Sequence, residues 1–231
     1  MWYQRNDSNK PYQNLFMIHK DIAEIRQRYA KKVLLEEEAA ASPFVQFEIW
    51  WKEAIDAALE EVNAMTLATA SNDGVPSARI VLLKDFSENG FMFFTNYESF
   101  KARQLEENPR ACLVFFWKEL ERQVRITGLV KRTSVADSDE YFNMRPEESR
   151  IGAITSPQSR IIESRKWIDE RYEKNRLHLT GKQFPRPDYW GGYIVRPIIM
   201  EFWQGRPSRL HDRLQYTLQD NNEWKRERLA P

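Results

Sequence analysis

The feature that most restricts the fold is a segment of strand-like runs, residues 64–96, that is broken twice by a turn signal. The signals are Asn72-Asp73-Gly74 and Glu88-Asn89-Gly90, and each stands between runs rich in β-branched and aromatic residues. Asp-Gly and Asn-Gly pairs in this setting indicate β-hairpins, because they tolerate the positive φ angles of tight turns. The segment therefore predicts antiparallel strands and argues against parallel β-α-β units.

Further segments with strand or helix character surround this one without regular alternation. Strand-like runs cover 112–120, 122–134, 193–203, 209–219 and 223–230, and helical patterns cover 17–38, 42–62, 99–108 and, with a loop at 152–159, 135–173. Ser42 and Pro43 suit the N-cap and first turn of the second helix. The pattern predicts a mainly β protein with appended helices (α+β), built on an antiparallel barrel. Residues 1–16 are polar and without a pattern, so we expect a mobile arm there. No long linker divides the rest of the chain, so we expect one domain at 17–231.

Composition narrows the classes of function. The chain of 231 residues has 35 basic and 34 acidic side chains, so we expect no global attraction to nucleic acid or to an anionic membrane. A single cysteine, Cys112, and three histidines without metal-site spacing argue against a disulfide framework and a structural zinc site, and we expect no bound metal. The absence of a long apolar stretch and of a signal-peptide core predicts a cytoplasmic protein.

Five short clusters carry side chains suited to binding anions, and the first two flank a predicted hairpin. Arg79 and Lys84 stand at either end of a strand that is apolar between them, for which two solvated strand ends are the simpler interpretation. Thr95 comes shortly before a predicted helix whose first turn carries Lys101. Free amide groups at a helix N-terminus, helped by a lysine, form an anion site, whereas an ordinary N-cap at Ser99 explains the pattern without a ligand.

The third and fourth clusters lie in the predicted helical region. Tyr141 and Arg145 are four residues apart and face the same way on a helix, and Ser149 continues that face if the proline break between them allows it. A phenol, a guanidinium and a hydroxyl together suit a phosphate monoester, and a surface ladder of side chains is the commoner alternative. Gln158 and Ser159 offer neutral hydrogen-bond donors in a loop.

The fifth cluster alternates along "RLHDR". Arg209, His211 and Arg213 would line one face of an extended strand. Three potential cations side by side repel one another unless an anionic or electron-rich group lies against them, and a solvated edge strand is the alternative. Two phosphate groups and a flat aromatic ligand would satisfy all five clusters, as a nucleotide-like cofactor and a phosphorylated substrate would.

Longer motifs add a resemblance to a known family. The stretches "RIVLLK", "QVRITG", "YFNMRPEESRIGA", "WGGY", "EFWQG", "RLHDR" and "ERLAP" follow in order between about Phe44 and Pro231. They resemble the pyridoxamine/pyridoxine 5′-phosphate oxidase family in sequence and spacing. The resemblance implies an antiparallel FMN-binding split β-barrel that acts as a homodimer, with the flavin at the subunit interface. It also implies oxidation of pyridoxine or pyridoxamine 5′-phosphate to pyridoxal 5′-phosphate by O2, with H2O2 and, from the amine, ammonia as products.

Carried over position by position, the resemblance implies two sets of contacts. Those to the flavin would be made by Arg79, Ile80, Val81, Leu82, Leu83, Lys84, Phe94, Thr95, Lys101, Gln123, Gln158, Ser159, Trp203 and Arg213. Those to the substrate would be made by Lys84, Tyr141, Arg145, Ser149, Arg209 and His211. The first four of these would hold the substrate phosphate, and Arg209 and His211 would be the catalytic pair against the pyridine ring. Arg79 and Lys101 would face the flavin phosphate.

A few positions depart from the family pattern. Phe100 stands where an arginine is common, which removes one expected cation from the flavin phosphate site, and Arg103, one helical turn later, is a candidate substitute. Phe94 stands where tyrosine is common, a benign change if the backbone makes the contact. Residues 25–29 loosely resemble a portion that approaches the substrate, and we interpret them as part of a packing helix.

Two alternatives remain at this point. Another FMN-binding split-barrel protein, such as a flavin reductase that uses a nicotinamide, would share the barrel but would not need the Arg209–His211 pair or the Tyr141 cluster. A barrel that stacks single-stranded nucleic acid on its aromatic side chains is disfavoured by the formal net charge of +1.

Overall fold

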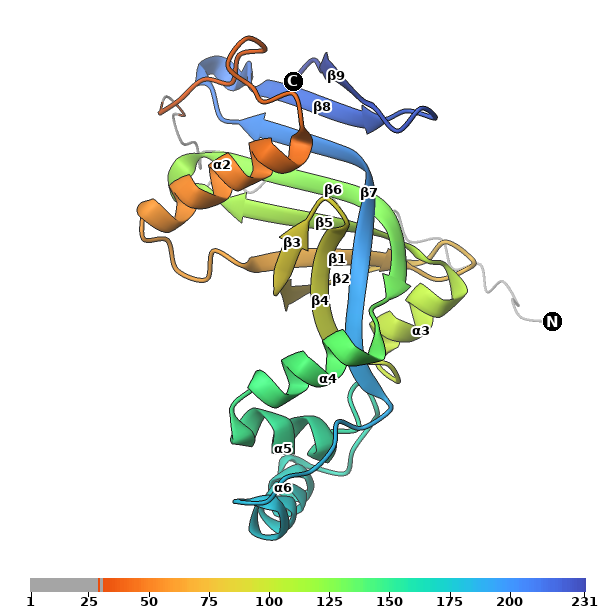
Figure 1. Ribbon diagram of the computed structural model, residues 1–231. Coiled ribbons are helices and arrows are strands. Elements are labelled where there is room, and N and C mark those ends of the chain that lie inside the picture. The colour runs from red at the N-terminus through yellow and green to blue at the C-terminus, as the bar shows by residue number, and fades with distance from the viewer. Residues whose placement is uncertain (1–28, 30) are drawn as a thin grey trace, which may run out of the picture.

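Every strand pair in the structure is antiparallel, as the hairpin signals predict. The computed structural model describes Tyr29 and residues 31–231 (Figure 1). In this part of the chain the sheet runs in the order β2-β1-β5-β6-β7-β4-β3, and β8 and β9 extend it from β7. The strands are β1 (Ala64–Ala70), β2 (Pro76–Leu82), β3 (Asp85–Ser87), β4 (Gly90–Asn96), β5 (Arg110–Trp117), β6 (Arg122–Arg132), β7 (Trp190–Gln204), β8 (Asp212–Leu218) and β9 (Trp224–Arg228).

Both predicted hairpins are present. β1 turns into β2 through Gly74, at φ 85°, and β3 turns into β4 through Gly90, at φ 132°. A Cβ on Gly90 would lie 2.3 Å from the carbonyl oxygen of Val195 in β7, so glycine is needed there for close packing as well as for the turn. The strand-like run between the two turns is divided at Leu83, whose side chain is buried in the core.

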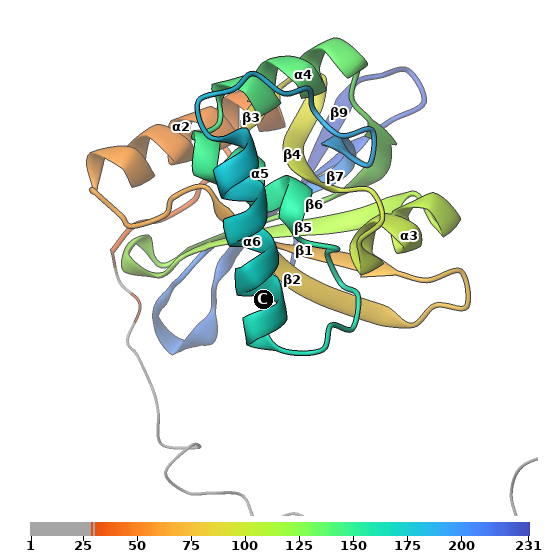
Figure 2. The same ribbon diagram turned by 90° about the horizontal axis from the view of Figure 1, so that it is seen from below.

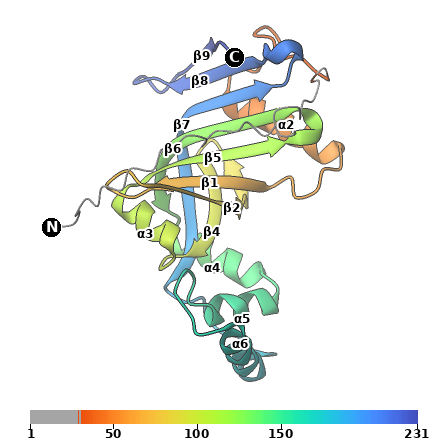
Figure 3. The same ribbon diagram turned by 180° about the vertical axis from the view of Figure 1, so that it is seen from behind.

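β7 is shared by the two parts of the sheet. β6 follows one of its edges, while the other edge pairs first with β4 and then, beyond Pro197, with β8. Pro197 has no N–H to donate and lies opposite a bulge at Gly128, where a Cβ would be 2.1 Å from the carbonyl oxygen of Arg196. The sheet therefore curls into a half-barrel, and Figure 3 shows β9, β8, β7, β6, β5, β1 and β2 following one another. This confirms the predicted antiparallel split barrel.

Helix α2 (Pro43–Asp56) closes the curl over an aromatic core. The Ser42 hydroxyl accepts a hydrogen bond from the Phe44 amide at 3.3 Å, which confirms the predicted N-cap. Phe47, fully buried on the inner face, lies edge-on to the rings of Phe86, Phe91 and Phe115.

The predicted C-terminal end of this helix, near residue 62, is wrong. α2 ends at Asp56, because Ala58 and Glu61 take positive φ angles of 52° and 44°. The resulting turn brings Leu59 and Val62 against the core. Tertiary packing has here overridden the helical tendency of an alanine- and glutamate-rich stretch.

The other helices lie around the opposite end of the sheet. α3 (Phe100–Glu107) packs beside β1, and α4 (Val135–Met144), α5 (Glu147–Thr155) and α6 (Arg165–Leu179) form a group beyond the Trp190 end of β7 (Figure 1 and Figure 2). The predicted helical region is therefore confirmed, but its internal loop lies at 156–164 and not at the predicted 152–159, because α5 continues to Thr155. No helix in the described residues is long and apolar enough to cross a membrane.

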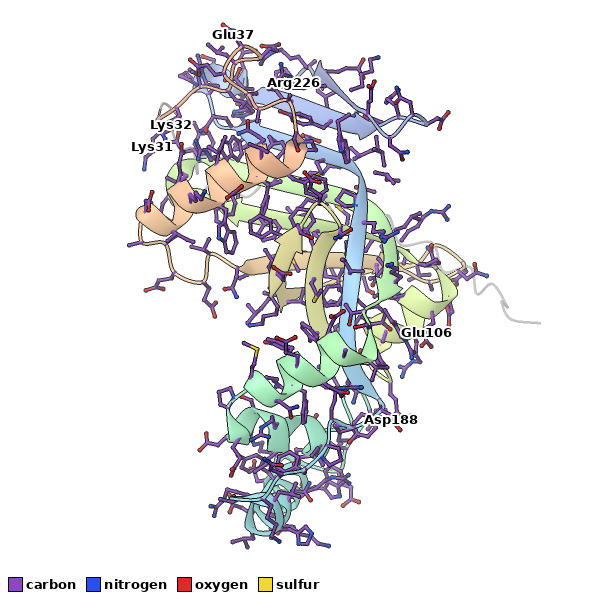
Figure 4. All side chains as sticks on the ribbon, viewed as in Figure 1. Lys31, Lys32, Glu37, Glu106, Asp188 and Arg226 are labelled. Atoms are coloured by element: carbon purple, nitrogen blue, oxygen red, sulfur yellow. The ribbon has the colours of Figure 1, made fainter. Side chains whose placement is uncertain are left out.

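Residues 34–40, which precede α2, run along β8 and β9 (Figure 4). The arm predicted at 1–16 and most of the helix predicted at 17–38 lie outside the described residues, but residues 31–42 contain only turns and bends. Arg226 and Arg228 of β9 donate to the carbonyl oxygens of Ala39 and Leu34 at 2.6 and 2.9 Å. In a helix each carbonyl oxygen would accept from the amide four residues later, but here side chains of β9 donate to these oxygens instead. The helix prediction is therefore wrong from Lys31 onward.

Candidate active site

A cavity of about 820 Å³ opens between strands β2 and β4 and helices α3, α4 and α5. Its walls come from β2, β4, the first residue of β7, the starts of α3 and α5, α4 and the loop at 156–164, so segments far apart in sequence meet there. The lining residues are Arg79, Ile80, Val81, Leu82, Lys84, Phe94, Thr95, Asn96, Phe100, Lys101, Tyr141, Arg145, Pro146, Ser149, Gln158, Ser159 and Trp190. Four of these residues are cations and none is a carboxylate, so the cavity favours an anionic ligand.

Arg79 and Lys101 are close enough to repel each other. The Lys101 ammonium is buried, and it donates to the hydroxyl oxygens of Thr95 and Ser99 at 3.1 and 3.4 Å. Burial, and secondly repulsion from Arg79, lowers the pKa of Lys101 to about 8. Burial also lowers the pKa of Arg79. Ser99 precedes α3 as predicted, but its hydroxyl makes no cap hydrogen bond.

The second pair of cations is Lys84 and Arg145. The Arg145 guanidinium lies 4.6 Å from the centroid of the Trp190 ring, and its Nη1 is buried without a hydrogen-bond partner among the described residues. Burial lowers the pKa of this guanidinium. A buried charged donor without a partner costs free energy that a bound anion would recover.

Tyr141 and Ser149 join this pair, as the helical spacing predicts. The Tyr141 ring stacks on Phe94 with 4.0 Å between centroids, and Lys84 Nζ lies 5.8 Å from the same ring. Arg145 is the C-cap of α4, with ψ at 146°, so the chain leaves the helix there and re-enters one in α5, where Ser149 lies. All three predicted phosphate ligands from this region line the cavity despite the break.

The loop pair and the substituted helix start also line the cavity. Gln158 is tethered to β4, since its Oε1 accepts from Thr95 Oγ1 at 3.1 Å. Phe100 lines the cavity, whereas Arg103 does not, and the Arg103 guanidinium donates instead to the Glu98 carbonyl oxygen at 2.7 Å. Arg103 is therefore turned away from the place where it would replace a missing cation.

Six predicted site residues do not line this cavity: Leu83, which is in the core, and Gln123, Trp203, Arg209, His211 and Arg213. Of the latter, Gln123, Trp203 and Arg213 form one row, because they are register partners across β6, β7 and β8. We call these three the Trp203 row. The buried Glu201 carboxylate accepts from Arg213 Nε at 2.8 Å and holds that guanidinium in place.

The predicted strand through Arg209 and His211 is wrong. β8 begins only at Asp212, and Ser208 and Arg209 take positive φ angles of 58° and 62° in a short 3-10 turn. A left-handed backbone cannot continue a strand, so the two residues do not alternate with Arg213. The Arg209 side chain is exposed and makes no hydrogen bond or ion pair with any described residue.

His211 is held beside the Trp203 row. Its ring centroid is 4.6 Å from that of Trp203, and its Nδ1 accepts from the Arg206 amide at 3.0 Å. Burial, and then the charge of Arg209, lowers the pKa of His211, which favours the neutral ring at pH 7. Because Nδ1 is the acceptor, the proton of the neutral ring lies on Nε2, which is free to donate to a ligand.

Tyr29 is a residue of this region that the sequence interpretation left out. Its ring lies edge-on to Trp203 and to His211, with 5.8 Å between centroids in each case. The loose family likeness of residues 25–29 was the one signal for it, and the packing-helix interpretation set that signal aside. Residues 25–28 lie outside the described part of the chain.

The cavity and the Trp203 row lie at opposite ends of β7, the long strand of Figure 1, because Trp190 begins this strand and Trp203 is its last residue but one. Trp190 lines the cavity and Trp203 is the centre of the row, and at about 3.3 Å per residue the strand between them spans ~40 Å. The bend near Pro197 shortens the direct path, but one ligand of nucleotide size does not bridge it. A single chain therefore holds two separate halves of the predicted site.

Solved structures share this fold. PhzG from Burkholderia lata 383, in complex with tetrahydrophenazine-1-carboxylic acid, has a TM-score of 0.81 and 29% identity, covering 86% of this chain and 98% of that chain. A pyridoxamine 5′-phosphate oxidase-related, FMN-binding protein of Nostoc punctiforme has a TM-score of 0.68 at 17% identity, covering 83% of this chain and 100% of that one, a likeness of fold alone. The curled sheet and its cationic cavity thus define a protein of the FMN-binding split-barrel class.

Sequence comparison narrows the class. The family model described as pyridoxamine 5′-phosphate oxidase matches residues 51–178, and one described as the pyridoxine 5′-phosphate oxidase C-terminal dimerisation region matches residues 190–231. Pyridoxine/pyridoxamine 5′-phosphate oxidases of Nostoc punctiforme and Bordetella pertussis are 52% and 53% identical, over 92% and 91% of this chain and 99% of each relative. The chain belongs to the pyridoxamine 5′-phosphate oxidase family, and it is an oxidoreductase with FMN as its cofactor. The dimerisation region, which contains Trp203 and Arg213, supports a homodimer.

Proposed function

We propose that the protein oxidises pyridoxine 5′-phosphate and pyridoxamine 5′-phosphate to pyridoxal 5′-phosphate, with molecular oxygen as the final electron acceptor. The alcohol loses two electrons and two protons at C4′, and O2 takes up both to become H2O2. The amine loses the same electrons and protons, and addition of one water then releases ammonia. FMN supplies the two-electron acceptor for the carbon–hydrogen bond that breaks.

The observation that carries this proposal is a cavity lined by four cations without a carboxylate, which suits two phosphate groups. Lys101 comes from α3 and Arg145 from the end of α4, while Arg79 and Lys84 come from β2 and the residues just after it. Arg145 in addition has a buried Nη1 that lacks a partner among the described residues. A flavin with one phosphate and a vitamer with another would neutralise both pairs, so the residues present fit FMN and the substrate.

Within the cavity, each pair has a stated task. Arg79 and Lys101 bind the flavin phosphate, with Thr95, Gln158 and the start of α3 fixing its orientation. Lys84, Tyr141, Arg145 and Ser149 bind the substrate phosphate. Anchoring both phosphates sets the substrate carbon against the flavin ring at the usual near-attack separation of about 3–3.5 Å.

The Trp203 row of a second subunit completes the site. Because the row lies at the far end of β7 from the cavity, it reaches a flavin only in the partner's cavity, which agrees with the place of Trp203 and Arg213 in the dimerisation region. Arg213 and Gln123 donate to the flavin ring, where negative charge develops as electrons arrive. Arg209 and His211 hold the pyridine ring of the substrate, with His211 Nε2–H as a donor.

The test is an absorbance spectrum of the purified protein before and after pyridoxine 5′-phosphate is added without oxygen. We expect a yellow protein whose flavin band bleaches with the vitamer alone and returns, with formation of H2O2, when oxygen is admitted. A protein that takes up no FMN, or whose flavin is reduced only by a nicotinamide, would overturn the proposal. The second outcome would indicate a flavin reductase of the same fold.

A further inference from the structure

A closed set of hydrogen bonds lies behind Arg79. Its guanidinium donates to Thr69 Oγ1 and to Ser77 Oγ, both at 2.6 Å, and to the Leu67 carbonyl oxygen at 3.1 Å. Both hydroxyl groups in turn donate to Gln104 Oε1, again at 2.6 Å. We propose that Gln104 is a positioning residue that holds Arg79 in the direction required to bind the flavin phosphate. The inference rests on the proposed role of Arg79.

The direction of each hydrogen bond in this set is determined. A guanidinium only donates, so the two hydroxyl oxygens must accept from it, and their own protons are left to bind elsewhere. Gln104 Oε1 takes both protons. Gln104 Nε2 lies 3.4 Å from the Val75 carbonyl oxygen, which gives the amide one orientation. Gln104 therefore fixes two hydroxyl groups, and these fix two nitrogens of Arg79.

Burial prevents water from replacing the hydrogen bonds of this set. Gln104 and Thr69 are 3% and 4% exposed, so neither has water as an alternative partner. Arg79 lies on β2, which is the last strand at this edge of the sheet, and it has no carboxylate partner among residues 29 and 31–231. Lys101 repels the guanidinium. Without the hydroxyl acceptors, its long side chain would leave the cavity wall and lose its order.

Helix α3 thus has two functions in the same site. Lys101 on its first turn supplies a charge to the cavity, and Gln104, three residues later, supports the other charge from behind. Removing Gln104 leaves both cations in the chain but releases the direction of one. The substitution should therefore weaken binding of the phosphate group and leave binding of the flavin ring unchanged.

The experiment compares FMN with riboflavin, which has the same ring and no phosphate. Dissociation constants are measured by quenching of flavin fluorescence on the full-length chain after its flavin has been dialysed away. We expect Gln104→Leu to weaken FMN binding by about tenfold and to change riboflavin binding less than about twofold. Gln46→Leu is the matched control, since Gln46 on α2 is also 3% exposed and its side chain accepts one hydrogen bond, from the Ala40 amide. We expect it to leave the ratio of the two constants unchanged.

Each other outcome has a defined meaning. An unchanged ratio in Gln104→Leu, or equal weakening of both flavins, overturns the positioning role. If wild-type protein binds FMN no better than riboflavin, the phosphate assignment of the proposed function fails instead. Should Gln104→Leu not fold, Ser77→Ala removes one hydroxyl from a half-exposed site, and an unchanged ratio there also overturns the inference. In a Thr69→Val/Ser77→Ala background, Gln104→Leu is expected to add nothing to the ratio, and a further loss would contradict the set of contacts described.

Discussion

Arg79 and Lys101 are two cations that line the same cavity, and the pKa of Lys101 falls to about 8 because of its burial and of repulsion from Arg79. The ordinary pKa of a lysine is 10.5. At pH values between about 8 and 10.5, Lys101 of the flavin-free protein has lost its proton. Binding of the phosphate must restore that proton, because the charged ammonium is the form that binds the anion. The pair therefore links cofactor affinity to pH above about 8.

We expect FMN affinity to be flat from pH 7 to about 8 and to fall above it, by up to about tenfold per pH unit. Fluorescence titrations at a series of pH values measure this. Lys101→Met should weaken binding and remove the slope, and riboflavin should show no slope with either protein. A wild-type affinity that stays constant up to pH 10 would contradict the assignment of Lys101 to the phosphate.

The same lysine affects the stability of the flavin-free protein with the opposite sign. Between pH 8 and 10.5 the unfolded chain holds the Lys101 proton and the folded chain does not, so the free energy of unfolding gains from this group as pH rises. Chemical denaturation of wild type and Lys101→Met across this range isolates the contribution. The free energy of unfolding of wild type minus that of Lys101→Met should rise with pH in this range, and a fall would contradict the sign.

Arg145→Ala should act on the substrate phosphate. The substrate phosphate would lose its proposed charge-assisted hydrogen bond from the buried Arg145 Nη1, worth about 1.5–3 kcal/mol. This loss corresponds to a KM raised ~10- to 100-fold with a smaller change in kcat. Steady-state kinetics with pyridoxine 5′-phosphate measure the change. Arg150→Ala is a suitable control, because Arg150 stacks on Phe184 at 5.0 Å and does not line the cavity. Equal effects of the two substitutions would remove Arg145 from the phosphate site.

Replacing Arg209 should affect catalysis far more than folding. The side chain is exposed and makes no hydrogen bond or ion pair within the described chain, so its loss should change the free energy of unfolding by less than about 0.5 kcal/mol. Because Arg209 has φ at 62°, asparagine is a better replacement than alanine. We expect kcat of Arg209→Asn to fall by roughly a hundredfold at an unchanged melting temperature. Wild-type turnover in this variant would exclude Arg209 from the mechanism.

Mixed dimers test whether each site is built from two chains. A dimer of one Arg145→Ala subunit and one Arg209→Asn subunit should contain one intact site and recover about half of the wild-type activity. The matched control places both substitutions in one subunit and none in the other, which damages both sites. If instead the control recovers activity and the first dimer does not, each site lies within a single chain.

Gly128 offers a test of the bend in β7. Gly128→Ala would place a Cβ 2.1 Å from a backbone oxygen of the neighbouring strand, and the backbone must shift to relieve it. We expect a loss of more than about 3 kcal/mol in the free energy of unfolding. Gly152→Ala, in α5 with no atom within 4 Å of the new Cβ, should be neutral or stabilise by about 0.5–1 kcal/mol. Similar denaturation midpoints for both variants would contradict this account of the bend.

Local signals predicted the hairpins and the composition of the cavity well. Gly74 and Gly90 act within a few residues, and so does the helical spacing that places Tyr141 and Arg145 on one face, so tertiary structure has little room to change either. The end of α2 and the segment around Leu34 were predicted wrongly because contacts with distant strands decide them. Arg209 was predicted on a strand because alternation of charges in sequence does not reveal a left-handed turn.

Separation of the site into two halves was beyond local patterns altogether. It depends on the length of β7 and on the exchange of its partner strand near Pro197, both of which are properties of the whole sheet. Family resemblance supplied the residues of both halves and the expectation of an interface. It could not supply the support of Arg79 by Gln104, since Gln104 and the two hydroxyl residues between them, Thr69 and Ser77, lie outside the recognised motifs.

The scarcity of acidic groups around the cavity has a consequence for the life of the protein. A subunit without ligands keeps four like charges together, and any phosphorylated compound that binds only the folded form raises its resistance to unfolding by mass action. Cells short of riboflavin or of vitamer would therefore hold a population that opens more often and meets proteases sooner. Abundance of this enzyme would then follow nutrient supply even at a constant rate of synthesis.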